Sequence, residues 1–169
     1  MAIELKTPRE IATMRRAGRI VAGTLELMQE MAAPGVTTGE LDRAAEEFIE
    51  SKGAVPSFKG YRGFPATICA SLNHEIVHGI PGRRKLSEGD LLKVDCGAIV
   101  DGYHADSAVT IAVGEVSEEA RRLMQVTEAS LRAGISAVRA GGRISDVSRA
   151  VQNCAESAGY SVVTEYTGH

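Results

Sequence analysis

Two aspartates, Asp95 and Asp106, stand inside segments that otherwise have the composition of β-strands. Asp95 follows a largely apolar run at 91–94, where a carboxylate is costly to bury unless a cation or hydrogen-bond donors compensate. The dipeptide Asp101-Gly102 between them favours a two-residue type I′ turn, which needs positive φ at both positions. The sequence therefore predicts a hairpin with one carboxylate on each strand.

The turn also predicts how the two strands pair. Val100 faces Tyr103 and Asp95 faces Ala108, so Asp106 lies diagonally across from Asp95 on the same face. A one-residue adjustment at the turn would make the two aspartates direct neighbours. Two like charges this close repel, so either one is protonated or a divalent cation lies between them. In the alternative, one carboxylate is solvated at an edge and the other caps a turn, but both occupy strand interiors.

His169 follows Gly168 at the end of the last predicted strand, where a glycine lets the backbone turn and present a side chain. A lone terminal histidine is usually solvated, so only its context makes it a candidate ligand. Carboxylates with one imidazole suit Mn²⁺, Co²⁺, Fe²⁺ or Zn²⁺, and the order of affinities does not choose among these ions.

His74 and His78 have the spacing of a helical zinc pair. However, the segment ends in Gly79-Ile80-Pro81, which is typical of a loop, where positions four apart do not share a face. We interpret His78 as a loop histidine that donates to a substrate carbonyl or carries a proton. The alternative is a histidine held by backbone groups alone.

Hydrophobic periodicity and capping signals predict the elements around these residues. A long helix begins after Thr7, and a second helix runs from Thr37 to Gly53; both have a capping threonine with a glutamate three residues later. The remaining elements are strands at 66–72, 90–100 and 103–113, helices at 117–138 and 145–158, and a strand at 160–166.

The sequence repeats itself at an offset of 106 residues. Six residues from Gly35 to Gly53 recur as identical residues between Gly141 and Gly159. We interpret this as a duplication, with residues 1–113 as the first unit and 117–169 as the start of the second. Counterparts of the first unit's strands would fall near 170–219, beyond this chain, and a lone strand would have an unpaired edge.

Composition excludes several classes of protein. Lys and Arg total 19 against 22 Asp and Glu, a balance that gives no indication of nucleic-acid binding. Cys69, Cys96 and Cys154 are widely spaced and odd in number, which favours a reducing compartment over a disulfide framework. We find neither a signal peptide nor a run of 18 apolar residues, so we expect a cytoplasmic protein that does not cross a membrane.

Eight segments of the chain, taken in order and spacing, resemble the type I methionine aminopeptidases, which have the α+β pita-bread fold of creatinase and aminopeptidase. The resemblance covers essentially the whole chain. It is carried by residues 37–42, 60–65, 71–73, 78–81, 89–90, 94–95, 101–106 and 165–169.

The resemblance implies a role for each matching residue. Asp95 would chelate one divalent metal ion, Asp106 would bridge two, and His169 would bind the second. His78 would contact the substrate and help to stabilise the tetrahedral intermediate. The methionine pocket would be lined by Tyr61, Phe64 and Cys69. The metals would be Co, Mn, Fe or Zn, and the substrates peptides or nascent proteins that begin with Met.

The chain departs from the family pattern in one respect. Members of the family continue past the Gly-His pair with a second histidine and two glutamates, so this chain keeps three of the five ligand residues. We therefore expect a single incomplete peptidase domain over residues 1–169, with little activity on its own. Two alternatives stay open: a non-catalytic relative or fragment that self-associates through its incomplete sheet, and a prolidase-like peptidase of the same fold.

Overall fold

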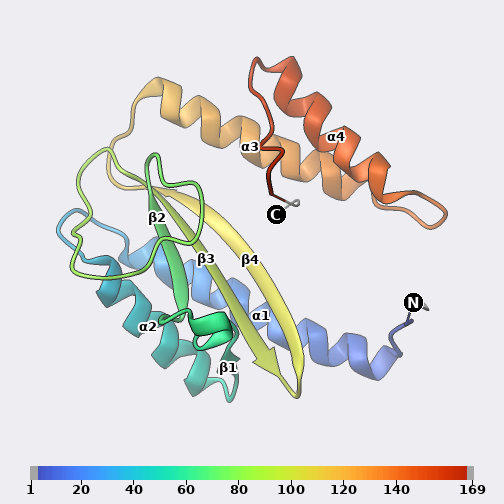
Figure 1. The fold of residues 1–169 in the computed structure, drawn as a ribbon, viewed down its shortest axis with the longest axis horizontal. Coiled ribbons are helices and arrows are strands. Elements are labelled where there is room, and N and C mark those ends of the chain that lie inside the picture. The colour runs from blue at the N-terminus through green and yellow to red at the C-terminus, as the bar shows by residue number, and fades with distance from the viewer. Residues whose placement is uncertain (1–3, 167–169) are drawn as a thin grey trace. The chain divides into compact units, whose positions relative to one another are not determined.

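A computed structural model describes residues 4–166 of the chain, which divides into two compact units, Met1–Val116 and Ser117–His169. The first combines two helices with an antiparallel sheet, and the second is a pair of helices (Figure 1). This is the α+β composition that the sequence predicts. Over residues 4–166, no helix is long and apolar enough to cross a lipid bilayer.

Unit 1 begins with the helices α1 (Pro8–Met31) and α2 (Thr38–Ser51). Both start with the predicted capping box: the Glu10 amide donates to Thr7 Oγ1, and the Glu40 amide donates to Thr37 Oγ1. In return, each glutamate accepts from the backbone N–H of its threonine. These reciprocal bonds satisfy amides that the first turn of a helix leaves without partners.

The sheet of unit 1 is antiparallel and is built around β3 (Leu91–Val100). On one side β3 pairs with β4 (Tyr103–Ala112), and on the other with β2 (Ile68–Leu72) and the short β1 (Val55–Pro56). The three longer strands match the predicted ones to within two residues. The sequence did not indicate β1, because two residues are too few to produce an alternating pattern.

Successive side chains along each strand point to opposite sides of the sheet, so its two faces differ. Leu92, Val94 and Cys96 point to one face and are completely buried, within the same hydrophobic core as Val21 and Met28 of α1. Figure 1 shows α1 and α2 lying against this face. The opposite face, called here the open face, carries the alternate residues of β3 and the residues paired with them.

Unit 2 contains α3 (Glu118–Ala137) and α4 (Ile144–Ser157). Its helix boundaries follow the sequence repeat: α2 and α4 begin and end 106 residues apart, and so do the last residues of α1 and α3. Gly35 and Gly141 both have positive φ, of 92° and 80°. The matching helix ends support the duplication predicted from the sequence.

The strand predicted at 160–166 is wrong, because these residues form no regular element. A strand is stable only when a neighbour accepts and donates its backbone hydrogen bonds. Within residues 117–166, unit 2 contains helices and loops but no strand with which this segment could pair. The composition favoured a strand, but the pairing that would form one does not occur there.

The hydrogen bond from Tyr103 Oη to Glu10 Oε1, 2.7 Å long, joins β4 to α1. It is the largest cause that lowers the pKa of Glu10 from 4.5 to about 2, ahead of the bonds from Thr7. Because the folded-state pKa is lowered, ionised Glu10 stabilises the fold above pH 4.5, and this contribution is lost as the pH falls from 4.5 toward 2.

We therefore predict that Tyr103→Phe lowers the urea midpoint of unfolding more at pH 7 than at pH 3, and that the pKa of Glu10 rises toward its ordinary value. Urea titrations and an NMR titration of the Glu10 carboxyl measure these two effects. Tyr61→Phe, which removes an exposed hydroxyl from the same unit, is the control. A midpoint change that is the same at both pH values would contradict the prediction.

Candidate metal centre

The β3–β4 hairpin places Asp95 and Asp106 on the same face of the sheet. Its pairs include Val100 with Tyr103, Asp95 with Ala108 and Gly97 with Asp106. The predicted two-residue register is therefore confirmed, and the one-residue adjustment does not occur. Diagonal neighbours in such a ladder have Cα atoms roughly 7–8 Å apart, so carboxylates extending from both strands can approach one another.

The turn that sets this register has the predicted backbone conformation. Asp101 has a φ of 48° and Gly102 a φ of 83°, so both central residues are left-handed, as a type I′ turn requires. Arg16 Nη1 of α1 donates to Asp101 Oδ2 at 3.1 Å. This ion pair is exposed, so it contributes little to stability, but it connects the turn to the helix layer.

Asp95 and Asp106 both lie on the open face of the sheet. Asp95 is half-buried and pairs with Cys69 of β2 on one side, whereas Asp106 is exposed. Gly97 lies opposite Asp106, and a Cβ added to Gly97 would come within 2.8 Å of Ser57 Cβ. The sheet therefore leaves little room beside the two carboxylates.

The two carboxylates act on the same neighbouring thiols. The pKa of Cys69 is raised to about 12, first by burial and then by the charges of Asp95, Asp106 and Asp42. Burial and the same two strand aspartates raise the pKa of Cys96 to about 12 as well. A neutral thiol is a weak ligand. The carboxylate oxygens are therefore better donors to a cation than these thiols, and hard or borderline divalent ions favour such oxygens.

Asp42 of α2 positions the strand that carries Cys69. Its Oδ1 atom accepts from the backbone amides of Thr67 and Ile68, each at 2.9 Å. These bonds tie the start of β2 to α2. This role is not visible in the sequence, because the donors are 25 and 26 residues away and leave no local pattern.

His78 lies in a loop, as predicted, and does not form a helical pair with His74. The neighbouring Gly79 lies beside β2, since the Ala70 amide donates to its carbonyl at 2.9 Å. With strands about 4.8 Å apart, the Gly79 backbone is roughly 10 Å from that of β3, two spacings away. His78 itself is exposed, and its loop therefore runs along the β2 side of the sheet.

A short 3₁₀ turn that the sequence does not indicate, η1 (Tyr61–Gly63), precedes β2; Tyr61 is its first residue and Phe64 follows its end. Tyr61 is 63% exposed, with the Arg62 guanidinium 5.4 Å from its ring centroid. Phe64 is half-buried. The structure thus brings Cys69 beside Asp95 but leaves Tyr61 largely in solvent.

His169, the third predicted ligand, lies outside the residues that the structure describes. Among residues 4–166, no group of three or more His, Cys, Asp and Glu side chains is arranged to hold a metal ion. Within residues 4–166, the candidate centre therefore consists of the Asp95 and Asp106 pair.

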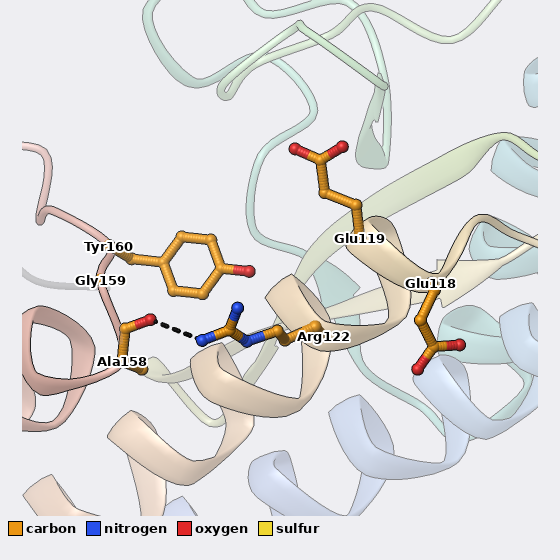
Figure 2. Close-up of a pocket in the computed structure, with 6 residues that line it drawn as sticks. All are labelled: Glu118, Glu119, Arg122, Ala158, Gly159 and Tyr160. Atoms are coloured by element: carbon orange, nitrogen blue, oxygen red, sulfur yellow. Dashed lines mark hydrogen bonds between the residues drawn. The ribbon is translucent and has the colours of Figure 1, made fainter.

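Unit 2 contains a hollow that none of the predicted site residues lines (Figure 2). There, Arg122 Nη2 donates to the Ala158 carbonyl at 3.0 Å, and its guanidinium lies 5.8 Å from the centroid of the Tyr160 ring. Arg122 therefore ties the segment after α4 to α3. These contacts of Arg122 stabilise the helix pair. The candidate metal centre lies on the sheet of unit 1 instead.

Comparison with known proteins places the chain in a family. Residues 12–169 match the model of metallopeptidase family M24. A methionine aminopeptidase of Clostridium acetobutylicum is 52% identical over 99% of this chain and 67% of its own length. The crystal structure of methionine aminopeptidase from Rickettsia prowazekii has a TM-score of 0.96 and 39% identity, covering 99% of this chain and 68% of that one. A prolidase from Pyrococcus furiosus shares the fold, with a TM-score of 0.83 at 22% identity over 92% of this chain and 45% of its own.

The chain belongs to metallopeptidase family M24, whose members are hydrolases with the predicted pita-bread fold. Within that family, the predicted relationship to the methionine aminopeptidases is confirmed by both the sequence and the structural matches. The chain spans about two thirds of the length of the relatives that it matches.

Gly97 gives a direct test of the crowding beside the carboxylates. We predict that Gly97→Ala lowers the free energy of unfolding by about 1–3 kcal/mol, because the new methyl group must displace Ser57. Gly18→Ala is the control, since a Cβ there meets nothing within 4 Å and should stabilise α1 by about 0.5–1 kcal/mol. Urea unfolding measures both changes, and an unchanged or increased stability of Gly97→Ala would refute the crowding.

Proposed function

We propose that this chain is part of a cytoplasmic methionine aminopeptidase, which removes the initiator methionine from nascent proteins by metal-dependent hydrolysis. The observation that carries the proposal is the pair of carboxylates, Asp95 and Asp106, on the open face of a sheet in an M24 chain. The substrates are peptides or proteins with an N-terminal Met. The prolidase-like alternative is supported by the shared fold alone.

Asp95, Asp106 and His169 are the residues that would hold the metal ions. Asp95 would bind one ion and Asp106 would bridge two, the ions being Co²⁺, Mn²⁺, Fe²⁺ or Zn²⁺. A bound divalent ion lowers the pKa of a water ligand and polarises a peptide carbonyl. The open face carries two carboxylates, and the raised pKa of Cys69 keeps its thiol neutral. These properties support the assignment, because carboxylate oxygens suit these ions.

His78 would donate a hydrogen bond to the carbonyl of the peptide that is cleaved. Its loop lies beside β2, the strand that pairs with the Asp95 strand, and the exposed position of His78 supports a contact with substrate. Tyr61, Phe64 and Cys69 would surround the methionine side chain, with the neutral Cys69 thiol as a soft, apolar contact for its thioether.

Self-association is a second candidate property, favoured by one observation. Among the strands of unit 1, β4 pairs with β3 alone, so one edge of a ten-residue strand is not used within the unit. An unused edge of this length can pair with a second chain.

We predict that Asp106→Asn weakens Co²⁺ or Mn²⁺ binding by more than the roughly 10- to 100-fold that loss of an outer-shell partner costs. Calorimetric titration measures the binding. Asp101→Asn, on the turn of the same hairpin, is the matched control, because asparagine also tolerates its φ of 48°. Equal binding by wild type and Asp106→Asn would remove Asp106 from the centre.

The activity itself is tested with the peptide Met-Ala-Ser and the metal-loaded chain. Because the chain spans about two thirds of its relatives, we expect slow release of Met, lost in Asp106→Asn and kept in Asp101→Asn. Release that persists in Asp106→Asn would indicate another enzyme in the sample. Preferential cleavage of a dipeptide with proline in second place would favour the prolidase-like alternative.

For self-association, we predict a concentration-dependent rise in sedimentation coefficient that Ser107→Lys reduces, because a charge on the exposed edge of β4 opposes strand pairing. Ser136→Lys adds the same charge to an exposed position of α3 and is the control. A monomer at all concentrations would disprove the proposal.

A further inference from the structure

The loop that carries His78 is held at both ends by side chains of the sheet. It leaves β2 at Asn73 and returns to the same strand at Gly79. Asn73 and His78 are both left-handed, with φ values of 52° and 59°. For a residue such as histidine this conformation is strained, and it persists only where surrounding contacts hold it.

Ser71 enforces the conformation at the returning end. Its Oγ atom accepts the Gly79 amide at 3.0 Å, while the Ala70 amide donates to the Gly79 carbonyl at 2.9 Å. A Cβ on Gly79 would lie 2.8 Å from the carbonyl carbon of Ala70 and 2.9 Å from Ser71 Cα. Gly79 is therefore pressed against the backbone of β2, directly after His78.

Lys93 holds the leaving end. Its Nζ atom donates to the Asn73 carbonyl at 2.5 Å. The Asn73 side chain accepts from the Leu91 amide and donates to Asp90, which fixes the residue further. Glu75 accepts from the Leu72 amide at 2.7 Å and from Arg84 at 2.7 Å, so the first residues of the loop are also tied to the sheet.

Ser71 and Lys93 are direct partners in the β2–β3 register and share the open face with Asp95. Ser71 is only 2% exposed, and a buried hydroxyl is normally kept for the hydrogen bonds that it makes. Here that bond goes to the loop and not to the sheet. One cross-strand pair therefore reaches both ends of the seven-residue segment 73–79.

We propose that Ser71 and Lys93 are positioning residues that together hold His78 in its left-handed conformation and direct it to the open face. The inference rests on the proposed function, since it assigns to His78 the substrate contact described above. In that function, Ser71 and Lys93 themselves would contact neither substrate nor metal. Their effect passes through Gly79 and Asn73.

The proposal is tested by NMR on the isotope-labelled 169-residue chain, without metal or substrate. The rates of amide hydrogen exchange and the backbone chemical shifts are measured. In Ser71→Ala, the Gly79 amide is expected to exchange about tenfold faster, and the shifts of His78 to move from left-handed values toward an average. Ser71→Thr, which keeps the hydroxyl, should restore both. Lys93→Met, which keeps the aliphatic stem, should speed exchange at Asn73 and Glu75.

Ser130→Ala is the matched control: this serine is 5% exposed and bonds the Val126 carbonyl within α3, so its loss should leave Gly79 unchanged. Unchanged Gly79 exchange in Ser71→Ala, or an equal increase at the amides of β3, would overturn the proposal. If Ser71→Ala does not fold, unchanged exchange at Asn73 in Lys93→Met is enough to overturn it. These measurements do not depend on catalytic turnover. If the proposed activity fails, Met is not released, yet the exchange data still show whether Ser71 and Lys93 hold the loop.

Discussion

The register of the β3–β4 hairpin determines which residues can meet on the sheet, and a two-residue turn sets that register. Asp101 and Gly102 both adopt positive φ, which aspartate tolerates and glycine adopts freely. With a turn of this length, Asp95 and Asp106 emerge on the open face while Val94 and Cys96 enter the core. A slip of one residue would exchange the faces of β4 and send Asp106 toward α1.

Much of the fold could be predicted from local pattern. The capping boxes at Thr7 and Thr37, the apolar stripe of α1 and the Asp101-Gly102 turn all act over a few residues, so the sequence shows them directly. The segment 160–166 was misjudged because its state depends on a pairing partner, and strand composition does not reveal whether that partner is present. The turn η1 was missed because Gly60 and Arg62 leave the helical conformation and interrupt any period.

The candidate centre was predictable only where chemistry and local pattern coincide. A carboxylate inside an apolar strand is conspicuous, which is why Asp95 and Asp106 could be named in advance. Ser71, Lys93 and Asp42 carry no such signal, because their partners lie 8 to 26 residues away and serine, lysine and aspartate are common on surfaces. The strain at His78 was equally hidden, since it arises from contacts at both ends of the loop and not from the histidine itself.

The closeness of Asp95 and Asp106 along the chain has a kinetic consequence. Hairpins joined by tight turns form on the order of 1–10 μs, well before contacts between distant segments, because only a short loop must close. The two carboxylates are therefore brought together early, while the helices that bury the other face are still docking. Their mutual repulsion then acts on the folding barrier as well as on the final structure, and it is largest where ionic strength is low. An ion that neutralises the pair would thus accelerate the assembly of the sheet in addition to serving the finished site.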